Sequence, residues 1–229
     1  MKREEVIQKL ISLIGAKSYL EVGVNRGETF HAVQCERKVA VDPKFLFDVA
    51  QAEQSNKNAV YHPTTSDVFF ETSPKQETFD VIYLDGLHTY DQTLRDLMNA
   101  VAKLNAGGVI VVDDVLPSSY VASLPDLTMV ERVKAITGET DMSWMGDVYR
   151  LVFFVESFMQ LYSYATVGNN HGQLVMWRAS RKAAVVGRMT ALEVAQAEFY
   201  KTITYREALV VQPMATILSR IQEDRSKTS

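Results

Sequence analysis

The segment from Glu21 to Gly27 reads Glu-Val-Gly-Val-Asn-Arg-Gly and directly follows the apolar pair Tyr19-Leu20. Gly23 and Gly27 lie four residues apart, immediately before a segment of helical character. Glycine adopts positive φ at little steric cost and lets the backbone approach a ligand closely. The first N–H groups of a helix have no partner within that helix and can bind a carboxylate or a phosphate. The segment therefore predicts a sharp turn from a strand into a helix, at a ligand.

Strand-like and helix-like segments alternate along the first half of the chain. Residues 109–112 are all β-branched, which is typical of a strand buried on both faces of a parallel sheet. Apolar residues recur at helical spacing between residues 89 and 104, and the Gly107-Gly108 pair is expected to end that helix. Strands are predicted at 18–24, 38–42, 59–62, 79–84 and 109–112, and helices at 27–34, 47–54 and 89–104. This alternation predicts βαβ units with helices on both faces of the sheet.

The second half of the chain has a different pattern. Residues 116–127 contain two prolines and three serines, which indicates a surface loop or flap. A helix is expected at 144–158, followed by strands at 161–167 and 173–178 around the turn Gly168-Asn169-Asn170-His171-Gly172. The predicted fold class is α/β: a doubly wound, mostly parallel seven-stranded sheet with an antiparallel edge strand.

Two helical regions complete the predicted organisation. Residues 1–14 mix charged and apolar positions as an amphipathic helix does, and we assign them with the sheet to a main domain at 1–180. Residues 181–229 are expected to form a helical appendage that packs on this domain or on a second copy in a homodimer.

Composition excludes several classes of protein. The net charge of -4 argues against a broad phosphate-binding face, so no nucleic-acid partner is expected. Cys35 is the single cysteine and is expected to be a packed thiol, because it has no partner for an internal disulfide. The first residues lack the unbroken apolar core of a signal peptide, and no stretch approaches a membrane span. We therefore expect a cytoplasmic protein without a membrane partner.

Acidic residues are placed at the carboxyl ends of the predicted strands. Glu21, Asp42, Asp85 and the pair Asp113-Asp114 lie at or near the ends of strands one, two, four and five. In a doubly wound sheet, ligands bind at these ends. Asp42 occupies the position where an acid typically accepts hydrogen bonds from the ribose hydroxyls of a nucleoside, although an Asp before Pro43 also suits a simple turn.

Three of these acids predict a cation site. Carboxylates of Asp85, Asp113 and Asp114 in one cleft would repel one another, and raised pKa values or a bound hard cation would relieve the repulsion. Among cations, Mg²⁺ suits oxygen ligands well. His88 follows Asp85 by three residues, where its imidazole could accept a proton near neutral pH.

These motifs resemble the class I S-adenosylmethionine-dependent methyltransferases over roughly residues 18–180. More narrowly, they resemble the branch of macrocin-type sugar O-methyltransferases and the related cephalosporin-pathway enzyme. Some relatives carry Glu at position 113, so this chain departs from them there. The residues that carry the resemblance are Glu21-x-Gly23-x-x-x-Gly27, Asp42, Asp85-Gly86-x-His88 with Tyr90, Gly107-Gly108, Asp113-Asp114 and Gly146-Asp147-Val148-Tyr149-Arg150.

The resemblance implies how the cofactor is held. The turn residues would line the methionine part of S-adenosylmethionine, with the Thr29 hydroxyl at its carboxylate. Asp42 would bind the ribose, and Ser66 would lie near the adenine. The implied cofactor-binding residues are Glu21, Gly23, Asn25, Gly27, Thr29, Asp42, Ser66 and Asp85.

The resemblance also implies a reaction. Asp85, Asp113 and Asp114 would hold Mg²⁺, which orients and acidifies a substrate hydroxyl, and His88 would be the general base. The expected acceptor is a hydroxylated small molecule such as a sugar or a natural product. Tyr120 and Trp144 are candidates for the wall of the acceptor pocket, or for ordinary packing.

Two other functions stay open at this stage. A nicotinamide-dependent oxidoreductase also uses a glycine turn and a ribose-binding acid, but the chain lacks the Gly-x-Gly-x-x-Gly spacing and that function leaves Asp113-Asp114 unexplained. The other alternative is a non-catalytic module that binds S-adenosylmethionine and acts through a protein partner.

Overall fold

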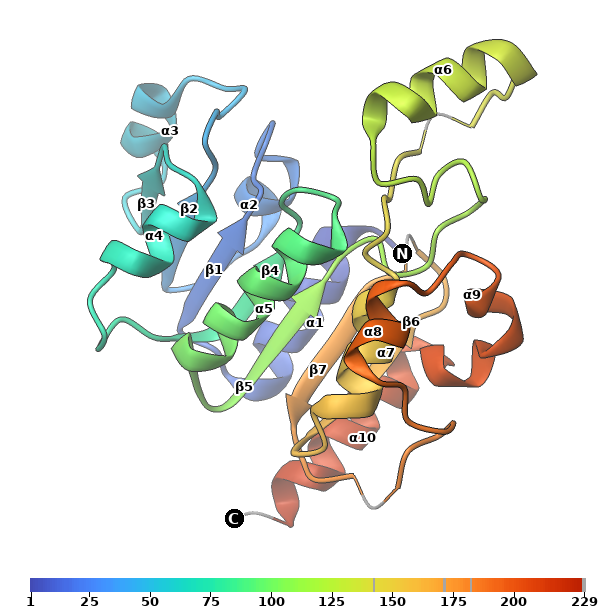
Figure 1. Cartoon of the computed structure of the whole chain (residues 1–229). Coiled ribbons are helices and arrows are strands. Elements are labelled where there is room, and N and C mark those ends of the chain that lie inside the picture. Colours follow the sequence, from blue (N-terminus) through green and yellow to red (C-terminus); the bar gives the residue numbers. More distant parts are fainter. Residues whose placement is uncertain (142, 171, 182, 228–229) are drawn as a thin grey trace.

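A computed structural model of the protein describes residues 1–141, 143–170, 172–181 and 183–227. Within these residues, eight strands form one sheet in the order β3-β2-β1-β4-β5-β7-β6-β8 (Figure 1). The strands are β1 Ser18–Val22, β2 Arg37–Val41, β3 Ala59–His62, β4 Phe79–Leu84, β5 Leu104–Val112, β6 Tyr162–Val167, β7 Leu174–Arg178 and β8 Val211–Gln212. The α-helices are α1 Arg3–Ile14, α2 Glu28–Ala32, α3 Val49–Ser55, α4 Ser66–Thr72, α5 Tyr90–Lys103, α6 Leu127–Thr137, α7 Arg150–Phe158, α8 Ala191–Ala195, α9 Lys201–Thr204 and α10 Met214–Ser226, with a 3-10 turn at Arg206–Leu209.

The sheet is doubly wound and mostly parallel, as predicted. β1 pairs in parallel with both β2 and β4, so the strand order reverses direction at β1. β7 runs antiparallel to its neighbours β5 and β6. The two-residue strand β8 adds an eighth strand to the seven predicted, and it pairs in parallel with β6. The reversal at β1 leaves a crevice at the carboxyl ends of β1 and β4, where ligands bind in such sheets.

Two hydrophobic layers enclose the sheet, because successive strand residues point to opposite faces. Tyr83 and Val111 are buried with apolar residues of α1, α2 and α10 on one face. Ile82 and Ile110 are buried with apolar residues of α4, α5 and α7 on the other. The central strands therefore have no polar face, which accounts for their continuous apolar sequences.

Most predicted helices form, with shifted boundaries. The amphipathic N-terminal helix is confirmed as α1, and the helix predicted at 89–104 is α5. The helix predicted at 144–158 begins only at Arg150 as α7. The Gly107-Gly108 pair lies inside β5 and does not end α5, which stops at Lys103. A Cβ on Gly108 would lie 2.7 Å from the Asp80 carbonyl oxygen, so this glycine lets two strands approach closely.

Two helices were not predicted. α4 follows Thr65, whose hydroxyl accepts a hydrogen bond from the Val68 N–H at 3.4 Å. α6 follows Asp126, whose carboxylate accepts one from the Met129 N–H at 3.1 Å. Both are N-cap interactions, which begin helices in otherwise ambiguous sequence. α6 stands away from the sheet, after the irregular 116–126 segment (Figure 1).

The C-terminal segment is joined to the main sheet. It contributes β8 as well as helices, and Met214, Ile217 and Ile221 of α10 are buried in the same layer as α1. Residues of this segment therefore pack on the chain's own sheet, and packing on a second copy stays a prediction. His171 of the predicted hairpin turn lies outside the described residues. Within the described part of the chain, no helix combines the length and the apolar character needed to cross a membrane.

Candidate functional site

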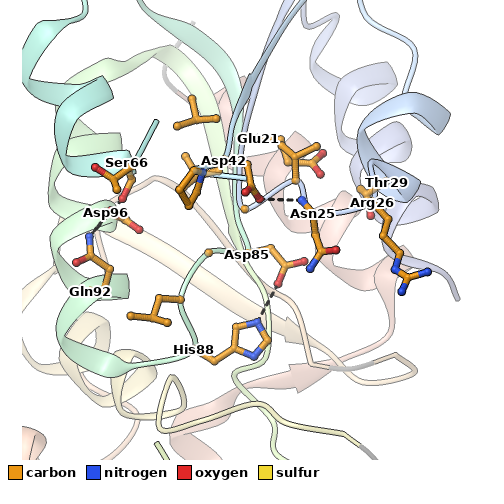
Figure 2. A pocket seen from close by; sticks show the side chains of 18 of the residues that line it. Glu21, Asn25, Arg26, Thr29, Asp42, Ser66, Asp85, His88, Gln92 and Asp96 are labelled. Carbon is orange, nitrogen blue, oxygen red and sulfur yellow. Dashed lines mark hydrogen bonds and ion pairs between the residues drawn. The ribbon is translucent and has the colours of Figure 1, made fainter. Parts of the chain in front are cut away.

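A cavity of about 860 Å³ opens at the carboxyl ends of β1, β2 and β4. Figure 2 shows side chains of the β1–α2 turn on one wall and side chains of α4 and α5 on the opposite wall. Seven of the eight residues predicted to bind the cofactor line it: Glu21, Gly23, Asn25, Thr29, Asp42, Ser66 and Asp85. Gly27 does not line the cavity, although its chain neighbours Arg26 and Glu28 do.

The β1–α2 turn has the geometry that its glycines predict. Gly23 has φ 85°, and a Cβ there would lie 1.9 Å from the carbonyl oxygen of Asp85. Gly27 has φ 76° and is the N-cap of α2. Side chains at either position would meet steric conflict, so the turn brings β1 and β4 together only with glycine.

Asp42 is oriented by backbone groups. Its Oδ2 accepts a hydrogen bond from the Asn25 N–H at 2.8 Å, and its Oδ1 accepts one from the Lys44 N–H at 2.7 Å. Both oxygens keep acceptor capacity, since a carboxylate offers about four lone-pair sites. The carboxylate is therefore fixed at the cavity wall and can still accept hydrogen bonds from a diol.

Glu21 is buried at the end of β1 and accepts a hydrogen bond from the Tyr19 hydroxyl. Burial raises its pKa well above the ordinary value of a glutamate. Thr29, in the first turn of α2, is also buried. Both side chains can therefore offer hydrogen bonds in a region from which water is largely excluded.

The opposite wall contains a polar group that the sequence did not single out. Gln92 of α5 donates hydrogen bonds to the Ser66 hydroxyl at 3.3 Å and to Asp96 Oδ1 at 3.0 Å. Asp96 is 3% exposed, and burial raises its pKa. Ser66 was predicted to lie near the adenine, whereas the sequence analysis of α5 considered only its apolar positions and not Gln92 or Asp96.

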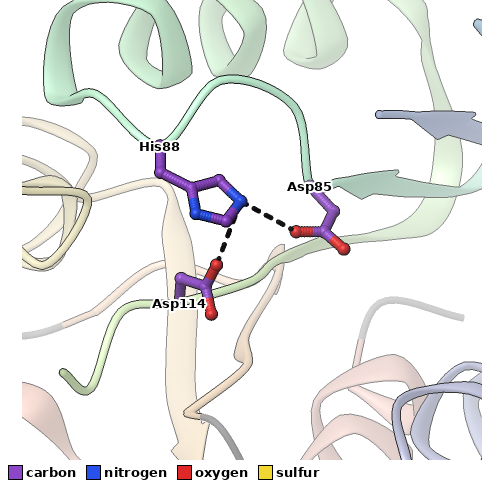
Figure 3. Close-up of side chains that lie close together, drawn as sticks. All are labelled: Asp85, His88 and Asp114. Atoms are coloured by element: carbon purple, nitrogen blue, oxygen red, sulfur yellow. Dashed lines mark ion pairs between the residues drawn. The ribbon is translucent and has the colours of Figure 1, made fainter. Parts of the chain in front are cut away.

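His88, Asp85 and Asp114 converge at the end of β4 and β5 (Figure 3). His88 Nε2 lies 3.6 Å from Asp85 Oδ1 and 3.2 Å from Asp114 Oδ2. The other ring nitrogen, Nδ1, lies 2.7 Å from the carbonyl oxygen of Trp144 and must donate, because a carbonyl only accepts. Three potential ligand atoms of these residues lie within 4.8 Å of one another.

Asp113, the third predicted cation ligand, faces a different partner. Its Oδ2 accepts hydrogen bonds from Arg3 Nε and from the Tyr83 hydroxyl, the latter at 2.7 Å. Arg3 Nη2 also lies 3.5 Å from Asp114 Oδ1. A guanidinium from α1 thus neutralises part of the acidic cluster, and nothing in the sequence pattern of α1 predicts it.

The cluster is charged, buried and incompletely paired. Burial raises the pKa of Asp113 and of Asp114, and the Asp85 carboxylate adds to both shifts. Burial lowers the pKa of His88, but the Asp85 and Asp114 carboxylates outweigh it and raise this pKa to about 9. Asp113 Oδ1 and Asp114 Oδ2 are buried and receive no hydrogen bond from the described residues.

A second cavity of about 10 Å³ adjoins these atoms and is lined in part by Asp85, His88, Asp113 and Asp114. Its volume is about that of one water-sized sphere. Carboxylate oxygens without hydrogen bonds adjoin this small polar space, and the Nδ1–H of His88 is held by a carbonyl. These groups form a donor set that suits a divalent cation.

Of the two candidates for the acceptor wall, Trp144 lines the large cavity and its ring packs 4.9 Å from that of His88. Tyr120 is 62% exposed and packs against Phe199 instead. Leu127, at the start of α6, also lines the cavity.

Comparison with known proteins agrees with this geometry. Residues 20–115 match the model of a protein family described as a methyltransferase domain. No curated protein sequence matches the chain. The narrower likeness to the macrocin and cephalosporin branch stays a prediction.

Several solved structures share the fold. A Staphylococcus aureus protein assigned as a caffeoyl-CoA O-methyltransferase has a TM-score of 0.52 at 14% identity, over 78% of this chain and 85% of the other. The O-methyltransferase TomG of Streptomyces achromogenes, in complex with S-adenosylmethionine, has a TM-score of 0.50 at 16% identity, over 78% and 80%. Residues 20–115 are therefore similar to a methyltransferase domain, and the chain shares the fold of these methyltransferase structures, as its sequence motifs predict.

Proposed function

We propose that the protein transfers the methyl group of S-adenosylmethionine to a hydroxyl of a small molecule such as a sugar or natural product, assisted by Mg²⁺. The observation that carries the proposal is the single cavity in which the glycine turn, Asp42 and the pair Asp85 and His88 meet. An oxygen acceptor is further supported by the similar structures, two of which are described as O-methyltransferases.

The cofactor would span the cavity from the β1–α2 turn to the α4–α5 wall. When bound, S-adenosylmethionine supplies an electrophilic methyl group. Asp42 accepts hydrogen bonds from the ribose hydroxyls with the lone pairs that Asn25 and Lys44 leave free. Glu21, Gly23, Gly27 and Thr29 surround the methionine part, and Ser66 lies at the adenine end.

The cation would bind at Asp85 and Asp114, whose Oδ2 accepts no hydrogen bond from the described residues and lies 3.2 Å from His88 Nε2. A bound Mg²⁺ lowers the pKa of a hydroxyl that it contacts. Asp113, the third predicted ligand, is not in the group of ligand atoms that lie within 4.8 Å of one another, and its Oδ2 accepts a hydrogen bond from Arg3.

His88 is the proposed general base. The carbonyl of Trp144 holds the Nδ1–H, so the neutral ring presents the Nε2 lone pair toward Asp85 and Asp114. With a pKa of about 9 and no cation present, the ring is protonated at neutral pH. Positive charge beside the two carboxylates favours the neutral ring, which can then accept the proton of the acceptor hydroxyl.

Isothermal titration with S-adenosylhomocysteine, with and without Mg²⁺, tests the cofactor assignment. We expect micromolar binding of S-adenosylhomocysteine and none of NAD, which serves as the control. Failure to bind S-adenosylhomocysteine would refute the proposal, and binding of NAD would favour an oxidoreductase.

His88→Ala tests the base. We expect methyl transfer to an acceptor found by screening to fall about 100-fold or more, with unchanged affinity for S-adenosylhomocysteine. His62→Ala is the matched control, since His62 does not line the cavity. Full turnover of the His88→Ala protein would exclude His88 as the base, and cofactor binding without turnover on any acceptor would favour a binding module.

A further inference from the structure

Arg3 is the first residue of α1, yet its side chain lies among acids that are 110 and 111 positions later in the chain. Its Nε donates a hydrogen bond to Asp113 Oδ2, and its Nη2 lies 3.5 Å from Asp114 Oδ1. The same side chain lines the large cavity. The guanidinium therefore contacts two predicted cation ligands from the side of the large cavity.

This placement is unfavourable without the acids. The amino-terminal turn of a helix carries partial positive charge, so a cation there is destabilised. Two-thirds of the Arg3 side chain is also removed from solvent, because its exposed fraction is 34%. The carboxylates of Asp113 and Asp114 provide the compensating attraction. Among the described residues, Arg3 is the only arginine that contacts them.

Arg3 supplies the positive charge that a divalent cation would otherwise supply. Asp113 Oδ2 accepts hydrogen bonds from Arg3 and from the Tyr83 hydroxyl, so this oxygen has less capacity to bind a cation. The opposite oxygen, Asp113 Oδ1, stays buried and without a hydrogen bond from the described residues. Asp114 is held between Arg3 on Oδ1 and His88 on Oδ2.

We infer that Arg3 is a positioning residue that competes with the divalent cation for Asp113 and Asp114. With Arg3 in place, the cation site consists of Asp85 and Asp114, and Asp113 is withheld from it. Arg3 thereby lowers the affinity for the cation and keeps the acids in place when the cation is absent. This inference rests on the proposed function, from which it takes the cation site.

The test is titration of MnCl₂ into the full-length protein, followed by calorimetry, because Mn²⁺ accepts the same oxygen ligands as Mg²⁺. We expect Arg3→Gln to bind Mn²⁺ about ten-fold or more tightly than the wild type, since one positive charge is removed within contact distance. Arg3→Lys keeps the charge and is expected to stay near the wild-type affinity.

Lys2→Gln is the matched control. It removes the same charge one residue away, but the Lys2 side chain is 78% exposed and its ammonium lies near Glu4 instead of the cluster. An Arg3→Gln protein that binds Mn²⁺ no more tightly than Lys2→Gln, including the case in which neither binds it, overturns the inference.

A measurement on the wild-type protein covers the case in which Arg3→Gln does not fold. The ¹⁵N-labelled Arg3 Nε–H signal, identified by its loss in Arg3→Lys, should shift and exchange faster with water when Mg²⁺ is added. An unchanged signal at saturating Mg²⁺ contradicts the competition. S-adenosylhomocysteine titration separates the two hypotheses, because its failure refutes the cofactor assignment while the Mn²⁺ comparison still decides the role of Arg3.

Discussion

Two clusters among the described residues, each with an arginine beside buried carboxylates, differ in how fully their atoms are paired. One joins Glu156 of α7 to Arg181, after β7. The other joins Asp113 and Asp114 to Arg3. The first fixes the path of the chain, whereas the second adjoins the cavity proposed to bind the cofactor.

Every carboxylate oxygen of the Glu156 cluster has a partner. Glu156 Oε2 accepts hydrogen bonds from Arg181 and from the Tyr164 hydroxyl, and Oε1 accepts them from the N–H groups of Val185 and Val186. Arg181 also donates to backbone carbonyls of α7 and β6. A buried polar network of this kind stabilises one chain path and has no capacity for a ligand.

The Asp113 and Asp114 cluster keeps unused capacity, since each residue retains one buried oxygen without a hydrogen bond from the described residues. Unpaired buried oxygens cost free energy, so a folded protein keeps them where a ligand completes them. The comparison teaches that burial and charge do not by themselves identify a site. The two clusters differ instead in their unused hydrogen-bonding capacity.

The largest expected effect comes from breaking the paired cluster. Glu156→Ala leaves Arg181 buried without its carboxylate, which should lower the free energy of unfolding by about 3–5 kcal/mol. Urea denaturation measures this loss. The folded fraction should bind S-adenosylhomocysteine as the wild type does, because Glu156 does not line the cavity.

Glu71→Ala is the control for Glu156→Ala, since Glu71 is exposed on α4 and its removal should change stability by about 0.5 kcal/mol or less. Equal effects of the two substitutions would show that the Glu156 network adds nothing to stability.

Asp114→Asn tests the opposite expectation for the incompletely paired cluster. We expect methyl transfer to fall about 100-fold while the free energy of unfolding at pH 7 changes little, because burial already disfavours the charged Asp114. Activity assays and urea denaturation measure the two quantities. Asp91→Asn, at a side chain that is 88% exposed, is the control, and a loss of stability comparable with that of Glu156→Ala would contradict the comparison.

The acidic cluster should also be detectable through the raised pKa of His88. Without a divalent cation, the pKa of His88 is about 9, so NMR titration should show protonated imidazole at pH 7. This raised pKa stabilises the fold fully below about pH 6.5, and the contribution is lost as the pH rises through about 9. Mg²⁺ should lower the pKa of His88, and Asp85→Asn should lower it as well.

His31 is the internal control for that titration. Burial lowers its pKa below the ordinary value of 6.5, so the two histidines shift in opposite directions. A His88 signal that titrates with the same midpoint in the presence and absence of Mg²⁺ would argue against a cation at Asp85 and Asp114.

Much of the fold and of the cofactor side could be predicted from local sequence. The glycine turn and the acids at strand ends depend on positions close in the chain, so spacing reveals them. Helices α4 and α6 were missed although Thr65 and Asp126 supply N-cap signals before them. β8 has two residues, too few to show any periodicity.

The contacts within the acidic cluster could not be predicted in the same way. Arg3 reaches Asp113 across 110 positions, and on an amphipathic helix a single arginine looks like any solvated charge. Asp96 and Gln92 likewise lie on a helix whose apolar stripe dominates its pattern. Three acids predict a cation, but only coordinates show that Arg3 contacts two of them.

A pair of tyrosines gives the smallest and most closely matched test. The Tyr83 hydroxyl lies 2.7 Å from Asp113 Oδ2 and 3.1 Å from Asp85 Oδ2 and can donate its one proton to either, and the Tyr164 hydroxyl lies 2.8 Å from Glu156 Oε2. Burial raises the pKa of both phenols, so both stay neutral donors. Each change to Phe should lower the free energy of unfolding by about 1 kcal/mol in urea titrations. Only Tyr83→Phe should also weaken Mn²⁺ binding, by roughly ten-fold, because only Tyr83 orients a proposed cation ligand. If both variants bind Mn²⁺ more weakly, the two clusters are coupled. If neither variant does, Tyr83 does not orient Asp85.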